Sequence, residues 1–374
     1  MRFPEFSGEW EKTSIGDCCS DLEYGMNAAS KNFDGVNKYI RITDIDEQTA
    51  EYKQDSLVSP DALLEDKYLV KDGDILFART GASTGKTYIY APQDGKLYYA
   101  GFLIRANVNF GTNPKFVFYQ TQTHRYKKWV SIMSMRSGQP GINSQEYASY
   151  QFWKPTKEEQ DKISDLMTLL DQRIQTQKKI IEDLKKLKDA ISFILFTSET
   201  YDKWELSNLA TIVMGQSPSS QYYNTDNEGL PLIQGNLDIT KGKLTPRIYS
   251  SEMTKKCHTG DVILTVRAPV GEVAIADFDA CIGRGVCAIR PFNNNYSVLI
   301  YQFLQHYKPK WISLEQGSTF TSVSRNDIMS IKIGIPSIQA IEILNILDDK
   351  ISIEDVILNN LNSQKNYLLT QLFI

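Results

Sequence analysis

The sequence predicts an α+β protein in which two β-rich domains are joined by two long antiparallel helices that form a coiled coil. One observation behind this is an uninterrupted apolar stripe at helical spacing through residues 155–196. Another is the return of that stripe at the C-terminal end of the chain. A third is a set of strand signals ahead of each stripe, which occurs twice and indicates an internal pseudo-twofold repeat.

The first long helix is predicted by the spacing of its apolar residues. After Pro155 no glycine or proline interrupts the chain as far as Phe196, and charged residues of both signs fill the remaining positions. At 1.5 Å per residue such a helix is roughly 60 Å long, which is more than a compact core can bury, so it requires a partner helix. The apolar positions of the stripe are Ile163, Leu166, Leu170, Ile174, Ile181, Leu184, Ile191 and Leu195.

The C-terminal segment supplies this partner. A shift of 177 residues places Leu170 on Leu347 and Asp171 on Asp348. The same shift matches Ile174 with Ile351, Ile181 with Leu358, Leu184 with Leu361, Ile191 with Leu368, Leu195 with Leu372 and Phe196 with Phe373. Two such stripes are expected to pack antiparallel. The alternative, that each helix only closes the core of its own domain, stays open at this point.

The globular segments also repeat. Each copy ends in an alternating strand and a proline, Pro155 or Pro336, and the clearest shared unit is a Gly-Asp turn, an apolar strand, an arginine, a glycine-bearing turn and a second strand. The matched segments are 10–15 with 204–209, which both begin Trp-Glu, 39–45 with 232–238, 73–90 with 260–276, and 137–143 with 316–324. The predicted boundaries are a first β-rich domain at 1–154, a first long helix at 155–200, a second β-rich domain at 201–335 and a second long helix at 336–374.

Composition narrows the class of protein. The chain has 374 residues, of which 41% are hydrophobic, and its formal net charge is −4. This charge argues against a protein that binds nucleic acid through overall electrostatic attraction, but it permits a nucleic-acid-binding protein whose basic groups are clustered. Five cysteines, an odd number, make a disulfide framework unexpected. No apolar run reaches the length of a membrane span and the N-terminus has no signal-peptide core, so a cytoplasmic location is expected.

No catalytic motif is complete. The segment 81–87 has three residues between its glycines where a phosphate-binding loop needs four, so a glycine-permitted turn is expected there. Asp61 and Glu65 are too close in sequence to form the facing strands of a metal-dependent nuclease. Cys257 and His258 lack nearby partners at metal-ligand spacing. The sequence therefore predicts a non-catalytic protein without a metal site.

The order of these motifs, repeated twice, resembles the specificity subunit of type I restriction–modification enzymes. The resemblance extends over essentially the whole chain, and its most specific items are the Trp-Glu start of each half, the Gly-Asp-strand segments at 73–79 and 260–264, Gly317-Ser318-Thr319, and Pro155 followed by Glu159-Gln160 and Leu170-Asp171. It implies that each β-rich domain is a target recognition domain for one half of a split DNA sequence. It also implies that the helices set the gap between the half-sites and dock the partner subunits.

The resemblance further implies partners and cofactors. The partners are double-stranded DNA, two methyltransferase (modification) subunits and motor/endonuclease (restriction) subunits. S-adenosylmethionine, ATP and magnesium are expected on the partner subunits, and this chain is expected to bind none of them.

Candidate DNA-binding residues follow from base chemistry: arginine pairs with guanine, and glutamine and asparagine suit adenine. In the first half they are Arg41, Arg79, Thr80, Lys86, Arg136, Ser137 and Gln139. In the second half they are Gln234, Asn236, Arg267, Ser318, Thr319 and Arg325, with Tyr222 and Tyr223 as possible stacking or backbone contacts. The residues expected to dock the partner subunits, on the charged outer face of the first helix, are Lys157, Glu158, Glu159, Asp161 and Lys162.

One rival interpretation remains. The acidic balance also fits an adaptor that displays two β-rich domains for protein or glycan ligands on a coiled coil, without binding DNA. The duplicated arginines and Gly-Ser loops count against it.

Overall fold

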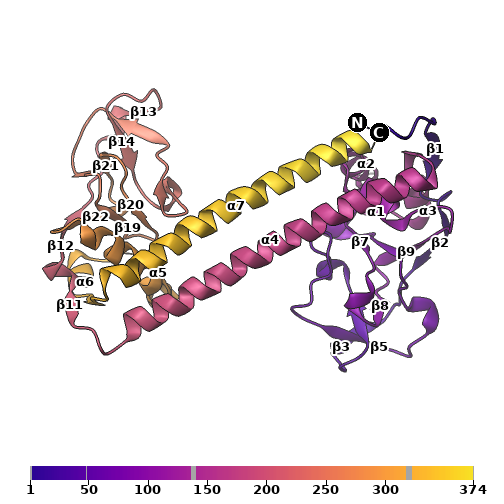
Figure 1. Ribbon diagram of the computed structural model, residues 1–374, viewed down its shortest axis with the longest axis horizontal. Coiled ribbons are helices and arrows are strands. Elements are labelled where there is room, and N and C mark those ends of the chain that lie inside the picture. Colours follow the sequence, from indigo (N-terminus) through magenta and orange to yellow (C-terminus); the bar gives the residue numbers. More distant parts are fainter. Residues whose placement is uncertain (1, 48, 136–139, 317–321, 374) are drawn as a thin grey trace. The chain divides into compact units, whose positions relative to one another are not determined.

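The computed structural model describes residues 2–47, 49–135, 140–316 and 322–373 (Figure 1). The chain divides into two compact units. Unit 1 comprises Met1–Gln177 and Ile357–Ile374, and unit 2 comprises Lys178–Val356. Each unit therefore contains one β-rich domain together with part of each long helix.

Unit 1 is built around a four-stranded sheet in the order β2-β9-β6-β7, with antiparallel neighbours. Three two-stranded pairs accompany it: β1-β10, β3-β5 and the parallel pair β4-β8. The elements are β1 (Glu11–Ser14), β2 (Cys19–Tyr24), β3 (Ala29–Asn32), β4 (Lys38–Ile40), β5 (Val58–Asp61), β6 (Ile75–Ala78), β7 (Thr87–Ile89), β8 (Leu97–Tyr99), β9 (Leu103–Val108), α1 (Pro114–Gln122), α2 (His124–Ser134), α3 (Ser144–Ala148), β10 (Gln151–Lys154) and the start of α4 (Lys157–Thr197).

Unit 2 repeats the central sheet, as β12-β22-β19-β20. A five-stranded sheet, β13-β17-β14-β21-β18, and the pairs β11-β23 and β15-β16 complete it. Its elements are β11 (Lys203–Glu205), β12 (Ala210–Met214), β13 (Tyr223–Asn224), β14 (Leu230–Ile233), β15 (Ile239–Thr240), β16 (Lys243–Leu244), β17 (Ile248–Ser250), β18 (Lys256–Cys257), β19 (Val262–Thr265), β20 (Val273–Ile275), β21 (Ala280–Ile282), β22 (Val286–Pro291), α5 (Asn295–Gln316), α6 (Arg325–Met329), β23 (Lys332–Gly334) and most of α7 (Ile338–Leu372).

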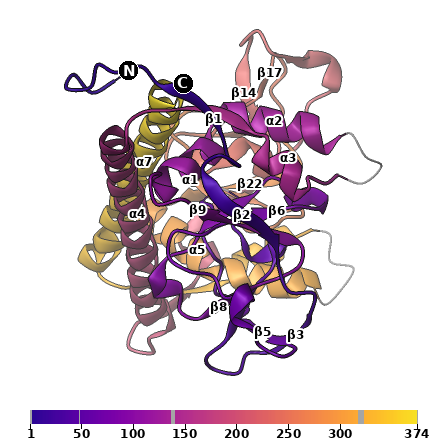
Figure 2. The same cartoon turned by 90° about the vertical axis from the view of Figure 1, so that its right-hand side faces the viewer.

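The central strand β6 of unit 1 is buried on both faces. Ile75 and Phe77 join the core that contains α1 and the helix ends, whereas Leu76 and Ala78 join a second core on the opposite face. In unit 2, β19 alternates in the same way between two cores. Alternate side chains of a strand point to opposite faces, so a continuous apolar run is what a doubly covered strand requires. Figure 2 shows the sheet of unit 1 with α1 and the helix ends beside it.

The Gly-Asp turn ahead of each central strand has a structural role. The Asp74 carboxylate is buried and accepts a hydrogen bond from the Lys71 backbone N–H at 2.8 Å, and the Asp261 carboxylate accepts one from the His258 N–H at 2.9 Å. Burial raises the pKa of Asp74. Each aspartate closes a tight turn, so the repeated motif marks the fold and not a reaction site.

The predicted equivalence of Trp10 and Trp204 is wrong. In the β1-β10 pair Thr13 lies opposite Phe152, and in the β11-β23 pair Trp204 lies opposite Ile333. Phe152 and Ile333 each precede the proline before a long helix by three residues, so Trp204 corresponds to Thr13. The two Trp-Glu dipeptides have the same sequence but occupy different positions in their strand pairs.

The antiparallel helix pair is confirmed within each unit. In unit 1 the start of α4 packs against the end of α7, through Ile163 and Met167 on one helix and Leu369 and Leu372 on the other. In unit 2 the end of α4 packs against the start of α7, through Leu195, Phe196, Ile341 and Leu344. Opposite ends meet in both cases, as antiparallel packing requires.

Two further sequence expectations can be compared with the structure. The five cysteines are all buried and free, and none forms a disulfide. Within the described ranges, no helix combines the length and the apolar character that crossing a membrane demands.

Candidate nucleic-acid interface

In unit 1 three segments that are distant in sequence meet at the end of β6. Arg79 donates its backbone N–H to the Phe102 carbonyl at 3.0 Å and accepts one from Ile142 at 2.9 Å. Thr80 forms a β-bridge with Gly141. We call the residues 78–81, 100–102 and 140–142 the junction of unit 1. It joins Arg79, the arginine after the central strand, to residues 140–142, which follow the segment where a loop was predicted.

Unit 2 builds the same junction from residues 265–267, 283–285 and 322–324. Val266 donates to the Gly285 carbonyl and accepts from the Val323 N–H, both at 2.9 Å, and Arg267 forms a β-bridge with Ser322. The predicted strand-arginine segment and the end of the predicted Gly-Ser loop are therefore brought together twice. Loops held this way on a rigid sheet are suited to present side chains to a ligand.

A fourth segment crosses each junction, at Gly25 in unit 1 and at Gly215 in unit 2, and glycine is required at both positions. A Cβ on Gly25 would lie 2.2 Å from the Ala100 carbonyl oxygen, and one on Gly215 would lie 2.1 Å from the Gly283 oxygen. Both neighbours are backbone atoms, which cannot turn away. The two junctions therefore share their close packing as well as their hydrogen bonds.

The two predicted arginines are not equivalent in this register. Arg79 corresponds to Val266, because the two make the same backbone hydrogen bonds, and Arg267 corresponds to Thr80, because the two form the same β-bridge. Arg79 is half-buried, with its guanidinium 4.7 Å from the ring centre of Tyr24, whereas Arg267 is exposed. Cation–π contact holds the Arg79 side chain against the sheet.

Arg41 is held by its own turn. Its guanidinium donates two hydrogen bonds of 2.8 Å to the Asp44 carboxylate, which raises the pKa of Arg41. In unit 2 the corresponding carboxylate, Asp238, is bound by Arg247 at 2.8 Å. Both arginines close a turn after a parallel strand, so the fork of Arg41 is occupied within the domain.

Gln234 and Asn236 lie on the matching turn of unit 2. Gln234 directly follows β14 as Arg41 follows β4, and its backbone N–H also donates to the turn aspartate, although Gly235 is the residue that begins the turn in unit 2. Its side-chain amide donates to the Tyr223 hydroxyl at 3.0 Å, and that hydroxyl donates to the Pro218 carbonyl at 3.1 Å. Asn236 is half-buried at the start of the turn, and Tyr222 is exposed.

Lys86 differs in charge from its counterpart. It pairs with Glu47 at 3.3 Å, and the corresponding residue in unit 2 is Glu272, which pairs with Lys308 at 2.5 Å. Opposite charges at matched positions argue against a phosphate contact shared by both units. A strand, β7, follows directly after Lys86, as expected for a turn and not for a phosphate-binding loop.

The remaining candidates fall into two groups. Arg325 is exposed and begins α6, directly after the N-cap Ser324, whose side chain and that of Asp327 form a capping box. The hydrogen bonds from Ser324 lower the pKa of Asp327. Arg136, Ser137, Gln139, Ser318 and Thr319 lie outside the described residues.

Three exposed residues in or beside the junctions were not among the sequence candidates. Tyr24 and Phe102 are 41% and 59% exposed beside Arg79. Arg284 is exposed between two glycines of the unit 2 junction. A Gly-Arg-Gly triplet directly after a buried apolar strand was the available signal for Arg284. No such signal existed for the aromatic residues, since only the strand pairing exposes them.

The expected charged outer face at the start of α4 needs correction. Glu159 is fully buried, and its carboxylate accepts hydrogen bonds of 2.8 and 2.7 Å from the Arg2 guanidinium. Asp161 accepts a bond of 2.6 Å from the Asn113 amide, which also caps α1. A buried carboxylate needs such a partner, so Glu159 anchors the N-terminal segment and is not available for docking.

The other three members of that set differ in exposure. Lys157 is half-buried and pairs with Asp161 one turn along the helix. Lys162 pairs with Glu5, although its side chain remains exposed. Only Glu158 among the five is exposed without an ion pair to a described residue.

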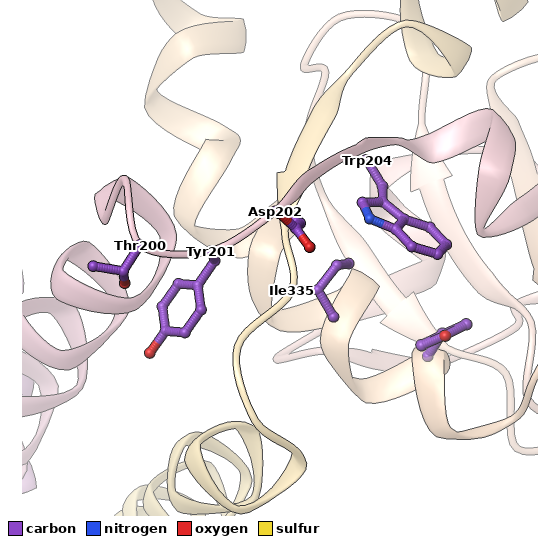
Figure 3. Close-up of a pocket in the computed structure, with 6 residues that line it drawn as sticks. Thr200, Tyr201, Asp202, Trp204 and Ile335 are labelled. Carbon is purple, nitrogen blue, oxygen red and sulfur yellow. The ribbon is translucent and has the colours of Figure 1, made fainter.

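A cavity of about 320 Å³ lies elsewhere in unit 2 (Figure 3). Its lining includes Tyr201, Asp202, Trp204 and Ile335, and Figure 3 shows Ile335 between the two aromatic side chains. It is near the start of β19, because Ser297, next to the lining residue Tyr296, donates to the Gly260 carbonyl at 2.8 Å. The junction follows the other end of β19, so the cavity is not part of it.

The described ranges contain no group of three or more histidine, cysteine, aspartate or glutamate side chains arranged to hold a metal ion.

Comparisons with known proteins identify the family to which this chain is similar. The family described as "Type I restriction modification DNA specificity domain" matches residues 7–186 and 198–363. A relative from Methanocaldococcus jannaschii, named "Putative type I restriction enzyme MjaX specificity subunit", is 29% identical over 363 residues, which cover 90% of this chain and 85% of that protein.

Two solved structures share the fold. The S subunit of a type I restriction–modification system from M. genitalium has a TM-score of 0.68 at 17% identity, over 100% of this chain and 99% of that chain. A chain from a structure on complex assembly and conformational transition of the type I R-M system has a TM-score of 0.61 at 22% identity, over 98% of each chain.

The family match spans both β-rich domains, each with one junction, and the rival interpretation as an adaptor finds no support. This chain therefore belongs to the type I restriction–modification DNA specificity family, as a specificity subunit that recognises DNA through two such domains.

Proposed function

We propose that unit 1 and unit 2 each read one half of a bipartite DNA sequence through their junctions. The observation that carries this proposal is the duplicated pairing of the segment after the central strand with a second segment distant in sequence, at Thr80–Gly141 and Arg267–Ser322. Sequence reading requires donors and acceptors at base edges, and side chains presented from adjoining loops supply them.

The two junctions carry different chemistry at matched positions. Thr80 in unit 1 stands where unit 2 has Arg267, and Gly101 stands where unit 2 has Arg284. Unit 1 instead adds the half-exposed aromatic residues Tyr24 and Phe102. Different donors and apolar groups select different bases, so we propose that the two half-sites differ in sequence.

We propose that the long helices dock two copies of a methyltransferase subunit. Leu169 on α4 in unit 1 and Ile346 on α7 in unit 2 are matched by the 177-residue shift, and they are 64% and 63% exposed. Exposed apolar residues at matched positions favour one kind of partner bound twice. These residues, with Glu158, replace the buried Glu159 in the docking proposal.

In this proposal the chain directs chemistry that its partners perform. Methylation would use S-adenosylmethionine on the methyltransferase subunits, and cleavage would use ATP and magnesium on the restriction subunits. The chain itself supplies DNA recognition and positioning.

The test is reconstitution of the chain with its methyltransferase subunits and S-adenosylmethionine. We expect methylated adenines at one bipartite sequence, mapped genome-wide, only when this chain is present. Gel shifts with random and selected duplexes give an independent reading of binding. Methylation that is independent of the chain, or binding without sequence preference, contradicts the proposal.

A further inference from the structure

The segment Gly283-Arg284-Gly285 in the unit 2 junction holds an arginine that the sequence candidates did not include. A Cβ on Gly285 would lie 2.1 Å from the Gln234 carbonyl oxygen, and one on Gly283 would lie 3.2 Å from the Ser217 Oγ. Glycine on both sides allows this backbone to pass between two other segments. Arg284, between the two glycines, is the one residue of the three with a side chain, and that side chain is exposed.

The backbone of this segment is held at three successive residues. Gly283 donates its N–H to the Ile233 carbonyl at 2.8 Å, and Arg284 donates its N–H to the Ser217 Oγ at 3.1 Å. Gly285 accepts a bond of 2.9 Å from the Val266 N–H, one residue before Arg267. These hydrogen bonds fix the backbone of Arg284, although its side chain is exposed.

Two other arginines of unit 2 bind carboxylates within the domain. Arg247 binds the buried carboxylate of Asp238 at 2.8 Å, and Arg290 binds that of Asp261 at 2.9 Å. The guanidinium of Arg284 forms no ion pair with any residue that the structure describes. Because the backbone of Arg284 is fixed and no described carboxylate pairs with its guanidinium, the two N–H groups of a bidentate contact remain available for an external acceptor.

We propose that Arg284 is a specificity-determining residue of unit 2 that reads one guanine of its half-site. The inference rests on the proposed function and adds a residue to it. The guanidinium fork matches the O6 and N7 acceptors of guanine in the major groove. Unit 1 has Gly101 at the matching position and cannot make this contact, so the guanine belongs to only one half-site.

The experiment uses the complex of this chain with its methyltransferase subunits. Methylation rates are measured on the recognised duplex and on duplexes with each base pair of both half-sites replaced in turn. Arg284→Ala is compared with Arg284→Lys, which keeps the charge but cannot form the bidentate contact. Lys243→Ala removes an exposed charge of the same unit from β16 and serves as the matched control.

We expect Arg284→Ala and Arg284→Lys to lower discrimination at a single guanine by about 10-fold to 100-fold and to leave the other positions unchanged. Lys243→Ala should retain the full preference. The unfolding temperature of each variant should equal that of the unchanged chain, because the side chain is exposed.

Three results overturn the inference. Equal weakening on every duplex, restored by Arg284→Lys, identifies a phosphate contact. Unchanged discrimination at every position places Arg284 outside the interface. A complex of the unchanged chain that methylates no bipartite sequence refutes the proposed function, and this inference with it, before any variant is considered.

Discussion

Lys365 of α7 lies 2.5 Å from Asp171 of α4, and this ion pair has a counterpart in unit 2 with the roles of the helices exchanged. There Lys188 of α4 lies 2.6 Å from Asp348 of α7. Each lysine and each aspartate is matched by the 177-residue shift.

Each of these aspartates also binds the globular part of its unit. Asp171 accepts a hydrogen bond of 2.9 Å from the Tyr119 hydroxyl on α1, and Asp348 accepts one of 2.7 Å from the Gln302 amide on α5. The repeat is thus conserved in ion pairs and hydrogen bonds as well as in its apolar stripe. Each aspartate couples the helix pair to one recognition domain.

Replacing either lysine should therefore weaken its unit by a similar amount. We expect Lys365→Ala and Lys188→Ala each to lower the free energy of unfolding by about 1–2 kcal/mol, since both pairs are partly shielded from water. Lys186→Ala is the control, because its pair with Glu182 is on the exposed helix surface. Chemical denaturation measures all three, and an equal effect of the control would refute a special role for the shielded pairs.

The two junction arginines should report on different half-sites. We expect Arg79→Ala to reduce discrimination in one half-site and Arg267→Ala in the other, by about 5-fold to 100-fold at the affected base. Methylome sequencing of the reconstituted complex measures both. If either variant weakens both halves equally, that arginine is structural or binds phosphate.

Helix length should set the number of unspecified base pairs between the half-sites. Adding seven residues between Ile174 and Ile181, and seven between Glu354 and Leu361, retains the heptad register of both helices. At 1.5 Å per residue the addition is about 10 Å, so we expect the gap to lengthen by about three base pairs of B-DNA. Changed half-sites with an unchanged gap would contradict this expectation.

The crossing glycines should not tolerate a side chain. We expect Gly25→Ala and Gly215→Ala each to destabilise its unit by about 2–4 kcal/mol, because the added Cβ would lie within 2.2 Å of a backbone oxygen. Gly111→Ala is the control, since nothing lies within 4 Å of its added Cβ and its φ is not positive. Thermal unfolding of the three variants measures the difference, and similar midpoints would show that the junction adapts.

Unit 2 should lose stability as the pH falls through the range where histidine titrates. Burial between aromatic rings, including Phe196 at 5.6 Å, lowers the pKa of His306 below its ordinary 6.5, Lys310 lowers it further, and Asp189 opposes the shift. The unfolded chain therefore binds the proton more readily, so this stabilisation is complete above pH 6.5 and is lost as the pH falls through the lowered pKa.

Denaturation midpoints between about pH 5 and pH 8 measure this effect. We expect His306→Gln to flatten the dependence by the contribution of this residue. An unchanged slope in that variant would assign the pH dependence to other groups.

The amino-acid sequence alone was sufficient to predict the periodic features of the chain. The α4 and α7 helices and their antiparallel pairing follow from a stripe that repeats after 177 residues, because helical spacing places those residues on one face whatever surrounds them. The paired central sheets follow from apolar strand runs after Gly-Asp turns. The family resemblance rests on the order of the same features, and the family match confirms it.

Only the tertiary structure decided which residues meet and which remain available. Strand register separates Trp10 from Trp204 and Arg79 from Arg267, and it brings Arg284 to a junction that no local pattern defines. Arg41 and Glu159 resembled surface charges, yet Asp44 and Arg2 bind them within the domain. Burial and pairing depend on partners distant in sequence, whereas periodicity depends only on neighbours, so the sequence specified the scaffold and the fold selected its exposed arginines.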